Sequence, residues 1–271
     1  MKFILLIILP VLLFAPQTYA INKDSLIRVV QNSVIKEEKV NALLSLSTME
    51  RELDTFSSLE YAKKSIEISK KIEDKTFLIK SFTKLGQTFR KYDSLDKALE
   101  NFLLGLELAQ KIEDDKWQAT CQNYLGSLYL QYGQNDKALE YYKKSYSISK
   151  SLDDSLGICN VLNNIGIIYW RNDQLDSSVK YMQQSLILSI DLGDSTGLIS
   201  SYNNLGMLHT SLGNLKRALG YYNQALIIAK SQSDRWETAN ILNNRANLYI
   251  ESNMLDSIES DLKYSIKISK E

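Results

Sequence analysis

The sequence has 271 residues, of which 44% are apolar and 24% charged, and its 32 basic residues balance 32 acidic ones. These values exclude a disordered or collagen-like chain and give no overall positive field for nucleic acid. One histidine and two cysteines are too few for a histidine-based catalytic centre, a zinc cluster or a disulfide framework, so we predict no catalytic residue, metal or cofactor.

The first twenty residues have the layout of a secretory signal peptide. Lys2 precedes an apolar run over residues 3–15, and residues 18–20 end in Ala20 with small side chains at the two positions that a signal peptidase reads. An uncleaved anchor is the alternative, but the run is shorter than the roughly 20 residues of a spanning helix. We therefore expect cleavage after Ala20, export to a periplasm or out of the cell, and no membrane insertion afterwards.

The rest of the chain repeats with a period of forty residues. Three columns of residues keep this interval. The first is Gly86, Gly126, Gly166 and Gly206; the second is Asp74, Asp114, Asp154, Asp194 and Asp234; the third is Asp93, Gly133, Asp173, Gly213 and Asn253. Residues of the third column tolerate a left-handed backbone, which predicts a tight turn inside each unit. The aspartates precede a helix in each unit and are predicted to cap its free amides.

Between these turns the apolar residues follow helical spacing, so each unit is predicted to be two antiparallel helices. Each glycine lies in the first helix and is predicted to face a small residue of the second, as Gly126 would face Ala138, which lets the two helices approach closely. Aromatic residues in a further column are predicted to cover the pair: Phe89, Tyr129, Tyr169, His209 and Tyr249. His209 is thus assigned to packing.

This pattern resembles the tetratricopeptide repeat, and its forty-residue spacing is similar to that of kinesin light chains and bacterial peptide-sensing regulators. The signature is carried by Leu125-Gly126, Tyr129, Ala138, Tyr142 and Ser145, and again by Leu205-Gly206, His209, Ala218, Tyr222 and Ala225. The resemblance implies an all-α, right-handed α-solenoid of about six repeats. We expect a lead-in segment over residues 21–34 and a solenoid over 35–271, with repeats at about 35–74, 75–114, 115–154, 155–194, 195–234 and 235–271.

Two neighbouring columns of the first helices are rich in asparagine, which is a poor residue for a helix interior. The columns contain Asn123, Asn163, Asn203 and Asn243, and Asn164, Asn204 and Asn244. The resemblance implies that inward asparagines bind the backbone of an extended peptide. The alternative is a ladder in which the amides bond to each other and hold the repeats in register. Both interpretations stay open from the sequence.

Trp170 and Arg171 are the most attractive anchors for a partner, since tryptophan and arginine dominate binding hot spots. A half-buried Trp170 that only fills the groove wall is the alternative. Cys121 and Cys159 are 38 residues apart, which places them on different sides of neighbouring helices, so both are expected as free thiols.

Together these features predict an exported, non-enzymatic scaffold that binds an unidentified protein or extended peptide in its concave groove, with no nucleic acid as partner. Self-association through the terminal repeats is a further alternative, because each terminal repeat has one face without a neighbour. The alternative function is an extracytoplasmic sensing module similar to the input regions of bacterial histidine kinases that contain such repeats.

Overall fold

The computed structural model describes residues 23–51 and 53–270, so the predicted signal peptide lies outside the described residues. Of the last helix, the side chains of residues 255–258, 260 and 268–270 are not described. The described part contains only helices, which are α1 (Lys23–Asn32), α2 (Lys36–Glu50), α3 (Thr55–Ser69), α4 (Thr76–Lys91), α5 (Leu95–Lys111), α6 (Asp115–Gln131), α7 (Asn135–Ser151), α8 (Ser155–Arg171), α9 (Leu175–Leu192), α10 (Ser195–Ser211), α11 (Leu215–Ser231), α12 (Arg235–Glu251) and α13 (Leu255–Lys270). The prediction of an all-α solenoid is confirmed.

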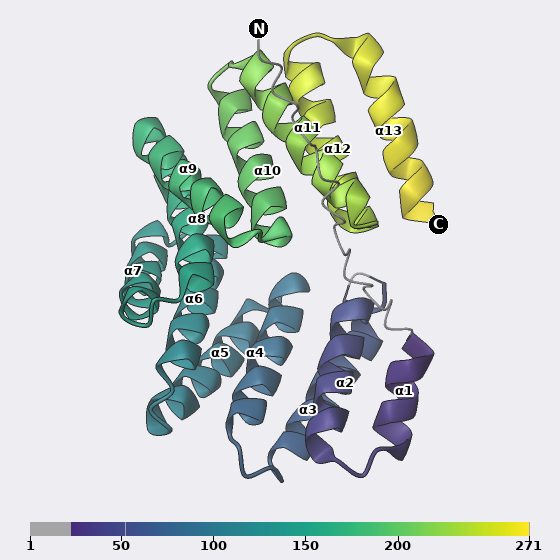
Figure 1. The fold of residues 1–271 in the computed structure, drawn as a ribbon, viewed down its shortest axis with the longest axis vertical. Coiled ribbons are helices and arrows are strands. Elements are labelled where there is room, and N and C mark those ends of the chain that lie inside the picture. The colour runs from purple at the N-terminus through teal and green to yellow at the C-terminus, as the bar shows by residue number, and fades with distance from the viewer. Residues whose placement is uncertain (1–22, 52, 271) are drawn as a thin grey trace, which may run out of the picture.

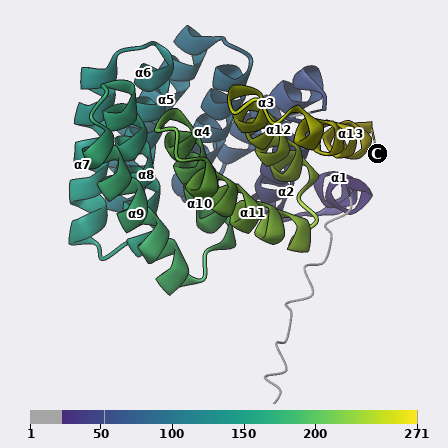
Figure 2. The ribbon, with the colours of Figure 1, turned by 90° about the horizontal axis from the view of Figure 1, so that it is seen from above.

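The helices after α1 form antiparallel pairs, from α2 with α3 to α12 with α13, and each pair packs on the next. Figure 1 shows these pairs arranged in an arc whose two ends, α1–α3 and α11–α13, lie on the same side of the molecule. Figure 2 shows the arc from above, with α10–α13 passing across the view of α1–α4. The short helix α1 packs against α2 ahead of the first pair.

The first helices of the pairs line the inner side of this arc. The even-numbered helices from α2 to α12 contact one another in sequence, whereas the odd-numbered second helices do not touch each other in the described part of the chain. In a curved stack the inner layer is the more closely spaced one. The concave surface therefore consists of the helices that carry the asparagine columns.

The turn inside each repeat has the predicted left-handed residue. The φ angles of this column are 57° at Asp93, 73° at Gly133, 59° at Asp173, 69° at Gly213 and 56° at Asn253. A second set of left-handed residues ends the second helices, where the sequence did not predict them: Glu113, Asp153, Gly193 and Ser233. In each of the four repeats over residues 75–234, the turn inside the unit and the turn that ends it therefore both contain a residue with positive φ.

Most of the predicted aspartate caps are present. Oδ1 of Asp114 accepts a hydrogen bond from the amide of Trp117 at 2.9 Å, and Asp74, Asp154 and Asp234 cap in a similar way. Asp194 is the exception, since its side chain makes no capping hydrogen bond. The negative charges at these positions also complement the positive ends of the helix dipoles.

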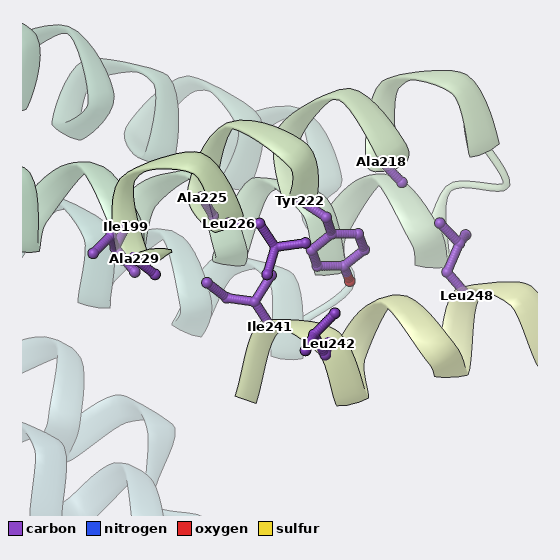
Figure 3. Packing of buried hydrophobic residues seen from close by; sticks show 9 residues of the cluster. All are labelled: Ile199, Ala218, Tyr222, Ala225, Leu226, Ala229, Ile241, Leu242 and Leu248. Atoms are coloured by element: carbon purple, nitrogen blue, oxygen red, sulfur yellow. The ribbon is translucent and has the colours of Figure 1, made fainter. Parts of the chain in front are cut away.

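The atoms nearest to the repeat glycines belong to large side chains that the sequence did not predict as their neighbours. At Gly166 the predicted small residue is in contact as well, because the hydroxyl of Ser178 donates to the main-chain oxygen of Gly166 at 2.8 Å. A Cβ atom at Gly126 would lie 2.6 Å from the ring of Tyr142, one helical turn beyond Ala138, and Gly206 stands in the same relation to Tyr222. Gly86, Gly126 and Gly206 each make room for a buried ring of the second helix, and Gly166 makes room for the side chain of Met182. Figure 3 shows Tyr222 and Leu226 pointing from α11 toward Ile241 and Leu242 of α12, which extends the core into the next repeat.

The aromatic column packs as predicted. The rings of Tyr129 and Tyr141 stack with centroids 5.2 Å apart, those of Tyr169 and Tyr181 at 5.1 Å, and those of His209 and Tyr221 at 5.4 Å. His209 is buried, and this burial, together with the positive charge of Arg217, lowers its pKa. A neutral imidazole therefore serves as the stacking ring of this repeat.

Both cysteines are buried free thiols, as predicted. Burial raises the pKa of Cys121 to about 12, so its thiolate is not populated near neutral pH.

In the last repeat Arg245 replaces an apolar residue, and its guanidinium forms two hydrogen bonds of 2.7 and 2.6 Å to Asp261 on α13. A buried ion pair thus holds α12 and α13 together where the other repeats use apolar contacts.

Candidate functional site

A cavity of about 160 Å³ opens on the concave side of α8, α10 and α12. We call it the amide cavity. Its lining combines apolar, amide and hydroxyl groups, namely Trp170, Met207, Thr210, Ser211, Tyr222, Asn244, Asn247 and Glu251. The Thr210 and Tyr222 hydroxyl oxygens lie 3.3 Å apart and bond to each other. Such a mixture of an apolar wall and a few converging polar groups is typical of a binding pocket.

Two pairs of the predicted asparagines form rungs between neighbouring repeats. Nδ2 of Asn164 donates to Oδ1 of Asn123 at 3.0 Å, and Nδ2 of Asn244 donates to Oδ1 of Asn203 at 3.1 Å. Each rung joins residues 41 positions apart, one repeat and one residue along the chain. These four side chains support the ladder interpretation, because each rung fixes the register of two first helices.

The rung between them is open. The same spacing would join Asn163 to Asn204, but Oδ1 of Asn163 is buried and has no hydrogen-bond partner, and Asn204 makes no side-chain hydrogen bond to any described residue. A buried amide oxygen without a partner is costly, on the order of 1–3 kcal/mol. Asn163 and Asn204 therefore remain available to an outside donor or acceptor.

The last asparagine of the column behaves differently. Oδ1 of Asn243 accepts a hydrogen bond from Oγ of Ser265 at 3.2 Å, which ties α12 to α13. This side chain is therefore engaged within its own repeat and does not form a rung.

Trp170 and Arg171, which adjoin in sequence, have separate roles. Trp170 lines the amide cavity and also packs against the buried cluster around Met182, so it fills part of the groove wall. Its role as an anchor for a partner stays a prediction. Nη1 of Arg171 donates to the main-chain oxygen of Leu130 at 2.9 Å and so caps the end of α6. The guanidinium is directed at the neighbouring helix and does not line the amide cavity.

A second cavity, of about 330 Å³, lies where the two ends of the arc approach each other. We call it the basic cavity, and its lining residues are Arg51, Gln87, Arg90, Lys91, Gln131 and Trp236. Lys91 of α4 and Trp236 of α12 meet here, with the ammonium nitrogen 5.5 Å from the centre of the ring. The two helices themselves are not in contact, so these side chains span the gap.

Burial perturbs the cations at this end of the groove. Burial, and secondarily the charge of Arg51, lower the pKa of Lys84 to about 8. Burial also lowers the pKa of Arg90. Nζ of Lys84 donates to two neutral acceptors, Oγ1 of Thr48 at 2.7 Å and Oε1 of Gln87 at 3.5 Å.

Several lining residues were not singled out from the sequence. Asn247 and Glu251 follow Asn243 and Asn244 by one and two helical turns, so their helical spacing could have placed them on the same face. Arg51 and Trp236 could not have been found in this way, because the curvature of the whole array brings them together. Within the described residues no cluster of His, Cys, Asp and Glu could hold a metal ion.

One protein-family model matches the sequence. Residues 93–151 and 157–231 match the model of the tetratricopeptide repeat. These segments are tetratricopeptide repeats. No curated protein matches the sequence. No helix in the described part is both long and apolar enough to cross a membrane.

Solved structures of tetratricopeptide solenoids resemble the chain in fold. BtubC (BKLC) from P. vanneervenii has a TM-score of 0.63 at 22% identity, with 80% of this chain and 91% of that chain covered. A Rap protein complexed with competence and sporulation factor has a TM-score of 0.72 at 15% identity, covering 92% and 69%. The Rap conjugation gene regulator of plasmid pLS20, in complex with the Phr* peptide, has a TM-score of 0.67 at 12% identity, covering 86% and 74%.

Proposed function

We propose that this chain is a non-enzymatic scaffold that binds an extended segment of another protein along its first helices. The amide cavity carries the proposal, because it places the Trp170 ring beside the amides of Asn244 and Asn247 on the concave surface. An extended peptide offers backbone donors and acceptors at regular intervals, and its side chains need apolar pockets. Two solenoids of similar fold, the Rap proteins named above, are complexed with competence and sporulation factor and with the Phr* peptide.

The asparagines divide between two tasks in this proposal. The rungs Asn123–Asn164 and Asn203–Asn244 hold neighbouring repeats in register. The open rung leaves Asn163 and Asn204 to bond with the partner's backbone, which would satisfy the buried Oδ1 of Asn163. Trp170 supplies the apolar anchor in the amide cavity, whereas Arg171 acts on α6.

The test is a selection of peptides from a displayed library of random twelve-residue sequences on the purified chain. A selected peptide is then titrated by fluorescence anisotropy against Asn247→Ala and Trp170→Ala. We expect Kd to rise at least fivefold for each variant, because both side chains line the amide cavity. Gln184→Ala, an exposed change on the outer helix α9, is the matched control and should leave Kd unchanged.

Two results would overturn the proposal. One is a library that yields no binding peptide on the wild-type chain. The other is a set of peptides whose Kd values are the same for the wild type and for both cavity variants, while all the variants keep the melting temperature of the wild type.

We further propose that residues 1–20 direct export and are then removed. Residues 21–34 form a lead-in segment ahead of the repeats, and residues 35–271 form the scaffold in a periplasm or outside the cell. Mass spectrometry of the exported protein should find Ile21 at its N-terminus, and an intact Met1 would contradict the proposal. The alternative use of the same groove is an extracytoplasmic sensing module, for which an adjacent kinase or regulator gene would be the evidence.

A further inference from the structure

We propose that the amide cavity holds a basic side chain of the partner segment, so that the ammonium group of a lysine or the guanidinium group of an arginine lies beside Glu251. This inference rests on the proposed function and specifies which kind of residue the amide cavity takes.

The charge of the amide cavity comes from Glu251, the one ionised side chain among the described residues that line it. No described cation forms an ion pair with this carboxylate. Burial raises the pKa of Tyr222, the hydrogen bond with Thr210 partly opposes this shift, and the negative charge of Glu251 raises the pKa further. The carboxylate therefore acts on the wall of the cavity without a counter-charge from the described residues.

The hydroxyl groups of the amide cavity face a ligand as hydrogen-bond acceptors. Oγ1 of Thr210 donates to the main-chain oxygen of Gly206 at 2.9 Å. Oγ of Ser211 donates in the same way to the main-chain oxygen of Leu208 at 2.8 Å. Because the proton of Thr210 is used on Gly206, the hydroxyl of Tyr222 is the donor in its 3.3 Å hydrogen bond to Thr210. All these hydroxyl protons stay within the protein, and oxygen lone pairs remain for the cavity.

The amide groups add acceptors to the same wall. Nδ2 of Asn244 donates to Oδ1 of Asn203 at 3.1 Å, which leaves Oδ1 of Asn244 to accept a hydrogen bond. Asn247 makes no side-chain hydrogen bond to any described residue. An ammonium or guanidinium group carries several donors and no acceptor, so it matches a wall of carboxylate, hydroxyl and amide oxygens. An anionic ligand would meet the same lone pairs with oxygens of its own.

The C-terminal ends of α8, α10 and α12 lie at the amide cavity. Trp170 is the next-to-last residue of α8, Ser211 is the last residue of α10 and Glu251 is the last residue of α12. The C-terminal end of a helix carries a partial negative charge of roughly half an elementary charge, which favours a cation nearby. The last turn of α12 contains no basic residue, so α12 does not supply that cation itself.

The position of Glu251 is basic or neutral in the other repeats. The equivalent residues at intervals of forty are Lys91, Gln131, Arg171 and Ser211. A carboxylate in the last turn opposes the helix dipole, so Glu251 does not stabilise α12 by its charge. A cation bound at the amide cavity would offset both the carboxylate and the negative end of the helix.

The apolar part of the amide cavity suits the stem of a basic side chain. Its volume of about 160 Å³ takes one side chain and is too small for a helix. Met207 and the ring of Trp170 line it, and the methylene groups of lysine and arginine pack on such surfaces while the charged group stays with polar atoms. The face of a tryptophan ring also attracts a cation.

The experiment compares three forms of the chain in the random twelve-residue peptide selection described above. They are the wild type, Glu251→Gln, and the control Glu107→Gln, which removes the same charge from an exposed position on α5. Peptides selected by the wild type and by the control should contain at least twice the Lys and Arg content of the starting library. Peptides selected by Glu251→Gln should lose this excess, because the variant keeps the shape of the cavity and removes its charge.

A selected basic peptide then separates direct contact from a general change in fold. Its Kd should rise at least fivefold for Glu251→Gln, and also for the wild type when its lysines are acetylated or its arginines are replaced by citrulline, because both changes remove the positive charge. The two changes together should raise Kd little more than either alone, since they remove the same contact. If Glu251→Gln weakens the charged and the uncharged peptide equally, its effect is structural and the inference is overturned.

The remaining outcomes are distinct. Wild-type peptides without a basic excess, or basic peptides whose Kd is the same for the wild type and Glu251→Gln, would overturn the amide cavity as a site for a basic side chain and leave the scaffold proposal standing. A wild-type chain that selects no peptide at all would overturn both.

Discussion

Replacing Gly126 with alanine tests the close packing of the repeat directly. The new Cβ would lie 2.6 Å from the ring of Tyr142, about 1 Å closer than a normal carbon–carbon contact. Tyr142 is fully buried and its hydroxyl donates to Oγ of Ser127 at 3.0 Å, so the ring has little freedom to move. Overpacking of this kind costs about 1–3 kcal/mol, whereas alanine gains about 1 kcal/mol over glycine in a helix. We expect a net loss of up to about 2 kcal/mol.

The control is Gly220→Ala in α11, where an added Cβ meets nothing within 4 Å. It should stabilise the chain by about 1 kcal/mol, and the difference between the two variants isolates the clash because helix propensity cancels. Gly166→Ala should fall between them, since its Cβ would meet the flexible side chain of Met182. Urea unfolding followed by circular dichroism at 222 nm measures all three. Equal stabilities for Gly126→Ala and Gly220→Ala would refute the packing argument.

Three further predictions concern buried polar groups. The pKa of Lys84 is about 8 in the fold, against an ordinary value of 10.5, so the unfolded chain binds more protons than the folded chain between pH 8 and 10.5. The free energy of unfolding of the wild type minus that of Lys84→Met should therefore rise over this pH range by up to about 3 kcal/mol. A difference that stays constant with pH in urea unfolding would contradict this. Arg245→Leu should cost about 3 kcal/mol or more by leaving Asp261 buried and unpaired, and Arg245→Leu/Asp261→Leu should recover most of that loss in the same assay. Cys121 should resist alkylation by iodoacetamide at pH 8 in the folded chain and react fully in 6 M guanidinium; rapid labelling of the folded chain would disagree with its burial.

The fold was predictable from local rules repeated in register. The left-handed turn at Asp93 and its equivalents follows from residue type alone, and a cap such as Asp114 follows from its place before a helix. The partner of each glycine was not predictable in the same way. Whether Gly126 faces Ala138 or Tyr142 depends on how far the second helix slides along the first, and both positions repeat with the same period.

The candidate site was predictable only in part, for a related reason. The forty-residue spacing predicted that the asparagines share one face of the first helices. It could not distinguish the hydrogen-bonded rung Asn123–Asn164 from the open rung at Asn163. That difference depends on side-chain orientation within one groove. The basic cavity was beyond sequence reasoning, because Arg51 and Trp236 meet only through the summed rotation of every intervening helix pair.

Because Lys91 and Trp236 meet across the opening between the two ends of the arc, the width of that opening depends on the geometry of every repeat. Each junction between successive pairs adds its own small tilt, and the tilts accumulate along the stack before they reach this one contact. A slight repacking at a distant junction, such as that between α7 and α8, would therefore widen or narrow the opening far more than it disturbs its own surroundings. Variants buried deep in the stack can in this way alter what the entrance admits without touching it.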